Sequence, residues 1–66
     1  MNTKKLKAAL VESGYTQRGL AKEMNMSKNT LNAKLNGKSA ITIDEALLFS
    51  EKLNLTKVSF ENIFLL

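Results

Sequence analysis

The chain contains no histidine, cysteine, proline or tryptophan. Without cysteine there is no disulfide framework, and without cysteine and histidine the usual zinc-ligand sets are excluded. The lack of histidine also removes the commonest general base, and no glycine-rich phosphate loop occurs, so we expect neither an enzyme nor a cofactor. Stability must come from helix packing, assisted by dimerisation, because so short a chain buries a limited core.

Long apolar runs are also missing. No run approaches the roughly 20 residues that span a bilayer, and Lys7 interrupts the first apolar stretch, so the start does not resemble a signal peptide. We therefore expect a soluble cytoplasmic protein with no membrane partner. Its residues 1–66 are expected to form a single domain.

Helix-start and helix-stop residues divide the chain into five short helices, and no segment has a convincing strand pattern. The predicted N-caps, in chain order, are Thr3, Thr16, Ser27, Thr42 and either Thr56 or Ser59. The predicted helix ends are Gly14, Asn25, Gly37 and Asn54. Glu45 lies three residues after Thr42, a spacing that predicts a capping box. The predicted fold is therefore all-α.

Apolar residues at helical spacing predict which faces are buried. In the first three helices they are Leu6, Leu10, Leu20, Ala21, Met24, Leu31 and Leu35. In the fourth helix the predicted stripe is Ile43, Ala46, Leu47, Ser50 and Leu53. The last helix offers Val58, Phe60, Ile63 and Phe64 for burial.

Residues 17–37, QRGLAKEMNMSKNTLNAKLNG, hold the second and third predicted helices, with a tight turn at Asn25 between them. On a helix with ~100° per residue, Leu31 and Leu35 fall within about 40° of each other and define the buried side. The third helix is therefore predicted to rest on the core and to leave its other side free.

That free side carries small polar residues and one lysine. They are Lys28, Asn29, Thr30, Asn32 and Ala33. Asparagine can bond bidentately to adenine, lysine can reach guanine O6 and N7, and an alanine or threonine methyl can touch the thymine methyl. The pattern indicates a helix that reads base edges in a DNA major groove. Ordinary solvent-facing polar residues are the alternative.

The charge is unevenly distributed along the chain. Residues 1–38 carry eight basic and two acidic side chains, a balance of +6, whereas residues 39–66 carry two basic and four acidic ones, a balance of −2. The basic part coincides with the predicted helix pair, as expected of a phosphate-binding face. A solvated, lysine-rich surface would explain the charge alone equally well. Because the basic residues coincide with the predicted helix pair, the pattern favours a nucleic-acid partner.

These motifs resemble the lambda-repressor-like (XRE-type) helix-turn-helix domains. The resemblance rests on Tyr15-Thr16-Gln17, Leu20-Ala21-Lys22-Glu23-Met24, Met26-Ser27-Lys28-Asn29-Thr30-Leu31 and Leu35-Asn36-Gly37-Lys38. The tail, with Ile41-Thr42-Ile43-Asp44-Glu45-Ala46, Leu53-Asn54-Leu55 and Ile63-Phe64, is similar to the last two helices of small phage and prophage members, including Cro-like regulators. The resemblance implies a compact five-helix DNA-binding domain whose helix-turn-helix is formed by helices 2 and 3.

Carried over by position, the resemblance implies a DNA interface. Lys28, Asn29 and Ala33 would face base edges, with Asn32 and Thr30 beside them. The implied phosphate-binding residues are Gln17, Arg18, Ser27, Asn36, Lys38, Lys34 and Lys7. The backbone amides around Gly37 would complete a phosphate clamp with Asn36 and Lys38.

Three positions depart from the family pattern. Asn25 stands where a glycine is common, and asparagine tolerates the left-handed conformation at a small cost. Gly19 replaces a glutamate often found three residues after the N-cap, so the second helix lacks a capping box. Ala33 stands where many members carry a longer polar reader, so this position would offer a base a methyl contact or little contact.

The resemblance implies a transcriptional regulator that binds a pseudo-palindromic double-stranded operator as a homodimer. If residues 1–66 are the full protein, we expect it to resemble Cro-like or other minimal regulators more than full repressors. Leu65 and Leu66 are candidates for a dimer contact. Two alternatives stay open: a modulator or antirepressor that binds a partner repressor, and the antitoxin of a toxin-antitoxin pair.

Overall fold

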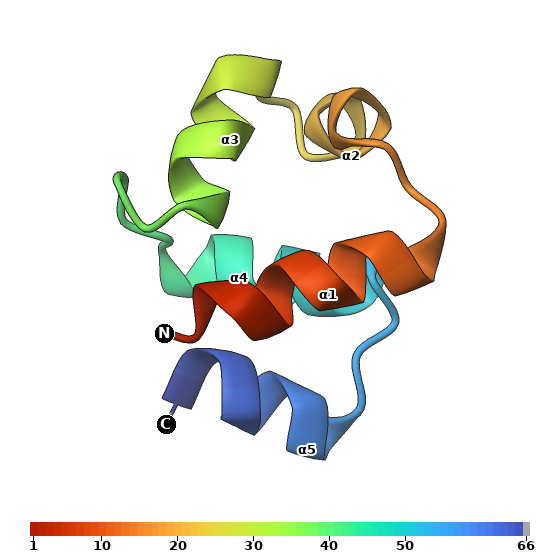
Figure 1. The fold of residues 1–66 in the computed structure, drawn as a ribbon, viewed down its shortest axis with the longest axis vertical. Coiled ribbons are helices and arrows are strands. Elements are labelled where there is room, and N and C mark those ends of the chain that lie inside the picture. The colour runs from red at the N-terminus through yellow and green to blue at the C-terminus, as the bar shows by residue number, and fades with distance from the viewer. Residues whose placement is uncertain (66) are drawn as a thin grey trace.

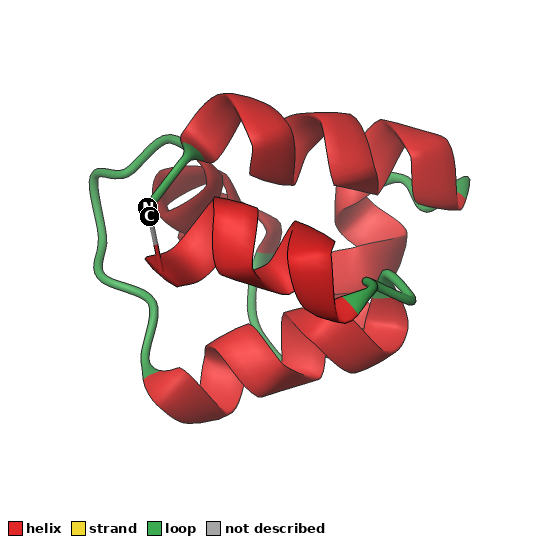
Figure 2. Cartoon of the chain, turned by 90° about the horizontal axis from the view of Figure 1, so that it is seen from below, coloured by secondary structure: helices red, strands yellow, loops and turns green. Residues whose placement is uncertain are grey.

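The computed structural model describes residues 1–65 and builds them into helices joined by short turns (Figure 1). The helices are α1 (Thr3–Ser13), α2 (Gln17–Glu23), α3 (Lys28–Leu35), α4 (Ile43–Lys52) and α5 (Lys57–Phe60), which continues into a π-helical turn, η1 (Glu61–Leu65). No strand occurs in residues 1–65, and Figure 2 shows helices and loops alone. The predicted all-α fold is confirmed.

Each α-helix begins at a side chain that accepts a hydrogen bond from the backbone N–H three residues on. The caps of α2 to α5 are, in order, Thr16, Ser27, Thr42 and Thr56. The capping box of α4 is confirmed, since the Glu45 carboxylate accepts from the Thr42 N–H at 3.0 Å. The prediction for α1 was wrong by one residue. Asn2 is the cap, accepting from the Lys5 N–H at 3.0 Å, and Thr3 is already helical.

Three helices end in the same turn, with one residue in the left-handed conformation. These residues are Asn25 (φ 58°), Gly37 (φ 75°) and Asn54 (φ 54°). After α3, the Gly37 N–H donates to the Lys34 carbonyl at 3.2 Å and the Lys38 N–H to the Ala33 carbonyl at 2.9 Å, which is the Schellman motif. Equivalent pairs of bonds close α2 and α4. The predicted turn at Asn25 is therefore confirmed.

The core lies between α1, α2, α3 and α4. Its largest fully buried side chains are Phe49, Leu6, Leu20, Leu31 and Leu35. Leu10, Ala21 and Met24 are buried as predicted. None of the helices in residues 1–65 combines the length and hydropathy that a membrane crossing requires.

The buried face of α4 differs from the predicted stripe. Ile43 and Leu47, expected inside, are 80% and 57% exposed, whereas Phe49 is fully buried. Ala46 and Leu53 are buried as predicted. The helix carries apolar residues on two sides, and the side with the phenyl ring faces the core because that ring removes more apolar surface from water.

The C-terminal helix and turn close the core beside α1. Ile63 is buried, and the half-buried Phe64 lies over Phe49 with ring centroids 6.4 Å apart and beside Phe60 at 5.0 Å. The predicted cover over the core is confirmed for Ile63 and Phe64, whereas Phe60 packs on Phe64 and Val58, also expected to be buried, is 63% exposed. The Asn2 N–H donates to the Ile63 carbonyl at 2.7 Å, which holds the start of the chain against η1 (Figures 1 and 2).

Candidate nucleic-acid interface

The pair α2 and α3 packs together at one end of the molecule, and the two helices run in different directions (Figure 1). Ala21 is 2% exposed at this contact, where a small side chain lets two helices approach closely. The left-handed Asn25 reverses the chain between them, and the Met26 N–H closes the turn by donating to the Ala21 carbonyl at 2.9 Å. This turn fixes the orientation of α3 on the core.

The outer side of α3 has the composition that the sequence predicts. Lys28, Asn29, Thr30 and Asn32 are exposed, and Ala33 is half-buried. Two of these side chains are already engaged: Thr30 Oγ1 accepts from Ser27 Oγ at 2.9 Å, and Asn32 Oδ1 accepts from Asn36 Nδ2 at 3.2 Å. The amide nitrogen of Asn32 is free to donate to a ligand, and its oxygen can accept one further hydrogen bond.

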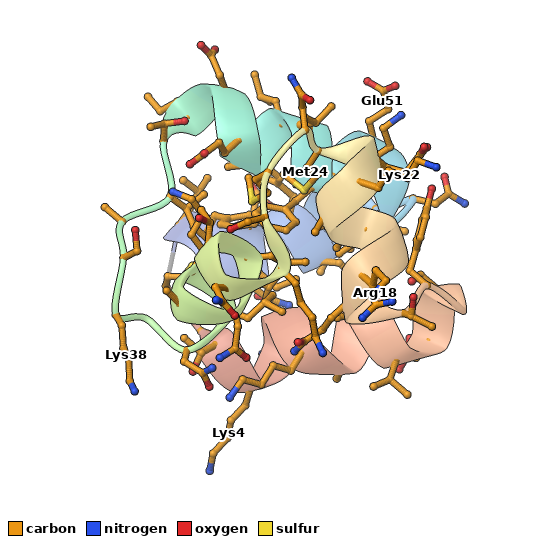
Figure 3. The ribbon with its side chains drawn as sticks, turned by 90° about the horizontal axis from the view of Figure 1, so that it is seen from above. Lys4, Arg18, Lys22, Met24, Lys38 and Glu51 are labelled. Atoms are coloured by element: carbon orange, nitrogen blue, oxygen red, sulfur yellow. The ribbon has the colours of Figure 1, made fainter. Side chains whose placement is uncertain are left out.

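The C-terminal end of α3 meets α1. Lys7 Nζ donates to Asn36 Oδ1, which joins two predicted phosphate-binding residues that are 29 positions apart. Lys38 follows on the loop after α3 and is exposed. Lys4 lies one turn before Lys7, and Figure 3 shows Lys4 and Lys38 extending from the same side of the molecule. Sequence reasoning missed Lys4, although its three-residue spacing from Lys7 on a helix was the signal.

The other predicted phosphate-binding residues lie at the starts of the two helices. Gln17 is half-buried and Arg18 is exposed in the first turn of α2, and Figure 3 shows Arg18 beside that helix. Ser27 is exposed at the cap of α3, where its hydroxyl accepts from the Thr30 N–H at 3.0 Å. All three therefore lie on the helix pair, near the solvent.

The structure corrects the expectation for Lys34. Its side chain is buried, and Nζ donates to the Ala40 carbonyl at 2.7 Å and to Glu45 Oε1 at 3.0 Å. Position 34 lies three residues after Leu31 and next to Leu35, so it shares their inward side of α3. The ammonium faces α4 and not the outer surface, so Lys34 is removed from the phosphate-binding residues.

A second correction concerns the backbone around Gly37. The N–H groups of Gly37, Lys38 and Ser39 all donate to carbonyls of α3, those of Lys34 and Ala33. These amides close the helix and are not available to a phosphate. A clamp at this end of α3 therefore has to use side chains.

Two acidic residues near α2 and the end of α4 lie away from Lys4 and Lys38 or are paired within the fold. Glu51, near the end of α4, lies at the opposite side of the molecule from Lys4 and Lys38 (Figure 3). Lys52 of α4 is used internally, with Nζ 3.6 Å from Glu23 Oε1 of α2. The lysines at the start of α1 and after α3 therefore lie apart from Glu51.

A family model described as helix-turn-helix matches residues 6–60, which is most of the chain. The chain therefore belongs to the lambda-repressor-like (XRE-type) helix-turn-helix family of DNA-binding regulators, with α2 and α3 as its helix-turn-helix. Comparison with curated proteins and with solved structures gave no significant match. The family assignment confirms the resemblance inferred from the sequence.

Proposed function

We propose that this chain is a sequence-specific regulator of transcription of the phage or prophage type, a repressor or Cro-like protein. Residues 1–66 would act as one domain that places α3 in the major groove of a double-stranded operator. The observation that carries the proposal is the exposed row of polar side chains on α3, beside the junction of Lys7 and Asn36. Buried leucines fix one side of this helix, so its polar side is presented rigidly.

Base reading is assigned to the outer side of α3. Lys28 and Asn29 are exposed in its first turn, and the N-terminal residues of a recognition helix reach base edges. Asn32 would donate its amide N–H to an acceptor on a base, while its oxygen also accepts from Asn36. Thr30 would contribute its hydroxyl, and the half-buried Ala33 would offer a methyl contact to thymine.

Phosphate binding is assigned to side chains around the helix pair. The proposed set is Gln17, Arg18, Ser27, Lys7, Asn36 and Lys38, with Lys4 added. Several lysine or arginine contacts would make binding strongly salt-dependent, because each releases counterions from DNA.

Alanine substitutions of the proposed readers test the assignment. Lys28→Ala and Asn29→Ala should each cost about 1–3 kcal/mol of operator binding and relax the preference at one base pair. Lys57→Ala is the matched control, because it removes an exposed lysine from α5, outside the proposed interface. Fluorescence anisotropy on operator and on random DNA measures both affinities. An equal loss on the two DNAs would contradict base reading by these residues.

The protein is also proposed to bind its operator as a two-fold homodimer, with half-sites about one helical turn apart. Leu65, at 66% exposure, supports an apolar contact, whereas Leu66 lies outside the described residues. The same exposed leucine supports the alternative that the chain modulates a partner repressor. A modulator would leave the DNA of its own promoter unshifted when tested alone, and a regulator would shift it.

A further inference from the structure

We infer that Lys34 is a positioning residue that holds the loop of residues 36–41 so that Lys38, two residues before Ala40, meets a DNA phosphate. The inference rests on the proposed DNA binding. It assigns Lys34 a role in that binding although Lys34 does not contact the DNA. Among the charged residues within 1–65, Lys34 is the one that is buried, at 8% exposure. A lysine in such a place needs a structural reason, because burying a charge is unfavourable unless it is paired.

The two partners of Lys34 lie on different parts of the fold. Nζ donates to the Ala40 carbonyl at 2.7 Å, in the middle of the loop, and to Glu45 Oε1 at 3.0 Å, in the first turn of α4. One ammonium therefore joins α3, the loop and α4. The aliphatic stem lies on the inward side of α3, so the charge reaches the edge of the core while the methylenes stay buried.

The Glu45 carboxylate is itself held in place. Its Oε1 accepts from the Thr42 N–H at 3.0 Å, while the Glu45 N–H donates to Thr42 Oγ1 at 3.1 Å. The bond from the Thr42 backbone, together with the charge of Lys34, lowers the pKa of Glu45 against the opposing effect of burial. The anchor is thus a fixed anion at the start of α4.

The Lys34 bond holds the middle of the loop, between the bonds that close α3 and the half-buried Ile41, which packs against the core. At one end, the Lys38 and Ser39 N–H groups donate to the Ala33 carbonyl, and at the other Thr42 caps α4. Ala40 is exposed, so apolar packing of its own side chain contributes little to holding it. A loop ordered before binding does not lose conformational freedom when it meets DNA, which raises affinity.

The test compares Lys34→Met with wild type on a duplex from the DNA flanking the chain's own gene. Methionine keeps the buried stem and removes the ammonium. We expect affinity to fall roughly tenfold at ~0.1 M salt, the order expected when charge-assisted hydrogen bonds to phosphate are weakened. The slope of log K against log salt should flatten by about 0.9 for each phosphate that the variant no longer neutralises. A role in stability alone would leave that slope unchanged in the folded protein.

Lys52→Met is the matched control. Lys52 is also partly buried and ion-paired, at 3.6 Å from Glu23, but it joins α4 to α2 and not to the loop. This variant loses the same charge and should keep wild-type affinity and salt slope. An equal effect of both substitutions would show that charge or stability, and not the loop, is responsible, and would overturn the inference.

A double-mutant cycle separates positioning from direct contact. In a background that already carries Lys38→Ala, Lys34→Met should have little further effect, because the side chain that it positions is gone. Equal losses in both backgrounds would mean that Lys34 touches phosphate itself, and would overturn the inference.

Circular dichroism establishes that each variant is folded. Should Lys34→Met fail to fold, Glu45→Gln takes its place, since the amide keeps the bond from Thr42 and loses the charge. We expect it to bind about two- to threefold more weakly, because a charge-assisted bond becomes neutral. Tighter binding, the usual result of removing an acidic group from a DNA-binding protein, would overturn the inference. If wild type does not bind DNA, the proposed function fails and the inference fails with it. If wild type binds DNA and the variants do not behave as expected, the inference alone fails.

Discussion

Phe49 is predicted to be the residue whose truncation costs this fold most. Its side chain is fully buried at the centre of the core, and its ring lies over that of Phe64 with centroids 6.4 Å apart. Phe→Ala changes at such sites cost about 3–5 kcal/mol, of which the aromatic pair supplies about 0.5–1.5 kcal/mol. A chain of this length has a total stability of roughly 3–10 kcal/mol. Phe49→Ala should therefore remove a large part of it.

Urea denaturation followed by circular dichroism measures this loss. With a slope near 1 kcal/mol per molar urea, the midpoint should move down by about 3 M or more. Ile43→Ala is the control on the same helix, because Ile43 is 80% exposed and surface changes stay within about 0.5 kcal/mol. The opposite order, with Ile43→Ala the more damaging change, would refute this packing of α4 and restore the stripe predicted from the sequence.

Three further predictions concern the helix ends and the α3–α4 loop. Asn54→Gly should stabilise the fold by up to about 1 kcal/mol, because Asn54 is left-handed at φ 54° and glycine adopts that conformation without steric cost. Thermal denaturation measures the gain in stability, and an unchanged midpoint would contradict backbone strain at Asn54. Gly37→Ala should destabilise by about 1–2 kcal/mol for the converse reason at φ 75°, and a neutral result would count against the Schellman turn. The pKa of Glu45 is lowered by the bond from the Thr42 N–H and by Lys34, so its contribution to stability is complete above the unfolded pKa of about 4.3 and is lost as pH falls through the folded value. Acid titration of wild type and Glu45→Gln tests this, since the variant should lose less stability below that pH, and parallel curves would contradict it.

The parts of the fold that sequence predicted well are those decided within a few residues. Thr16, Ser27 and Thr42 each bond to a backbone N–H three positions away, so the residue type and its local spacing are enough to identify the cap. Asn2 in place of Thr3 is a near miss of the same kind, because two suitable caps stand side by side. The residue type alone does not decide which of two adjacent residues, both good N-caps, begins the helix.

The parts that sequence could not predict depend on distant residues. α4 has apolar residues on two sides, and only packing against the other helices selects Phe49 over Ile43. Sequence alone places Lys34 on the outer surface because lysine is usually exposed, and its burial depends on Glu45, eleven positions away. The junction of Lys7 with Asn36 likewise requires α1 to lie against the end of α3. In the interface, the helix face was therefore predictable and the bonds that support it were not.

Whether α3 reads a specific operator is tested most directly by a footprint of the wild-type protein on the DNA flanking its own gene. We expect a protected, pseudo-palindromic segment whose half-sites lie about 10 base pairs apart, centre to centre, bound at least ~1,000-fold more tightly than random DNA. Uniform protection without a defined segment, or no protection at concentrations that bind random DNA, would contradict sequence-specific reading by this helix.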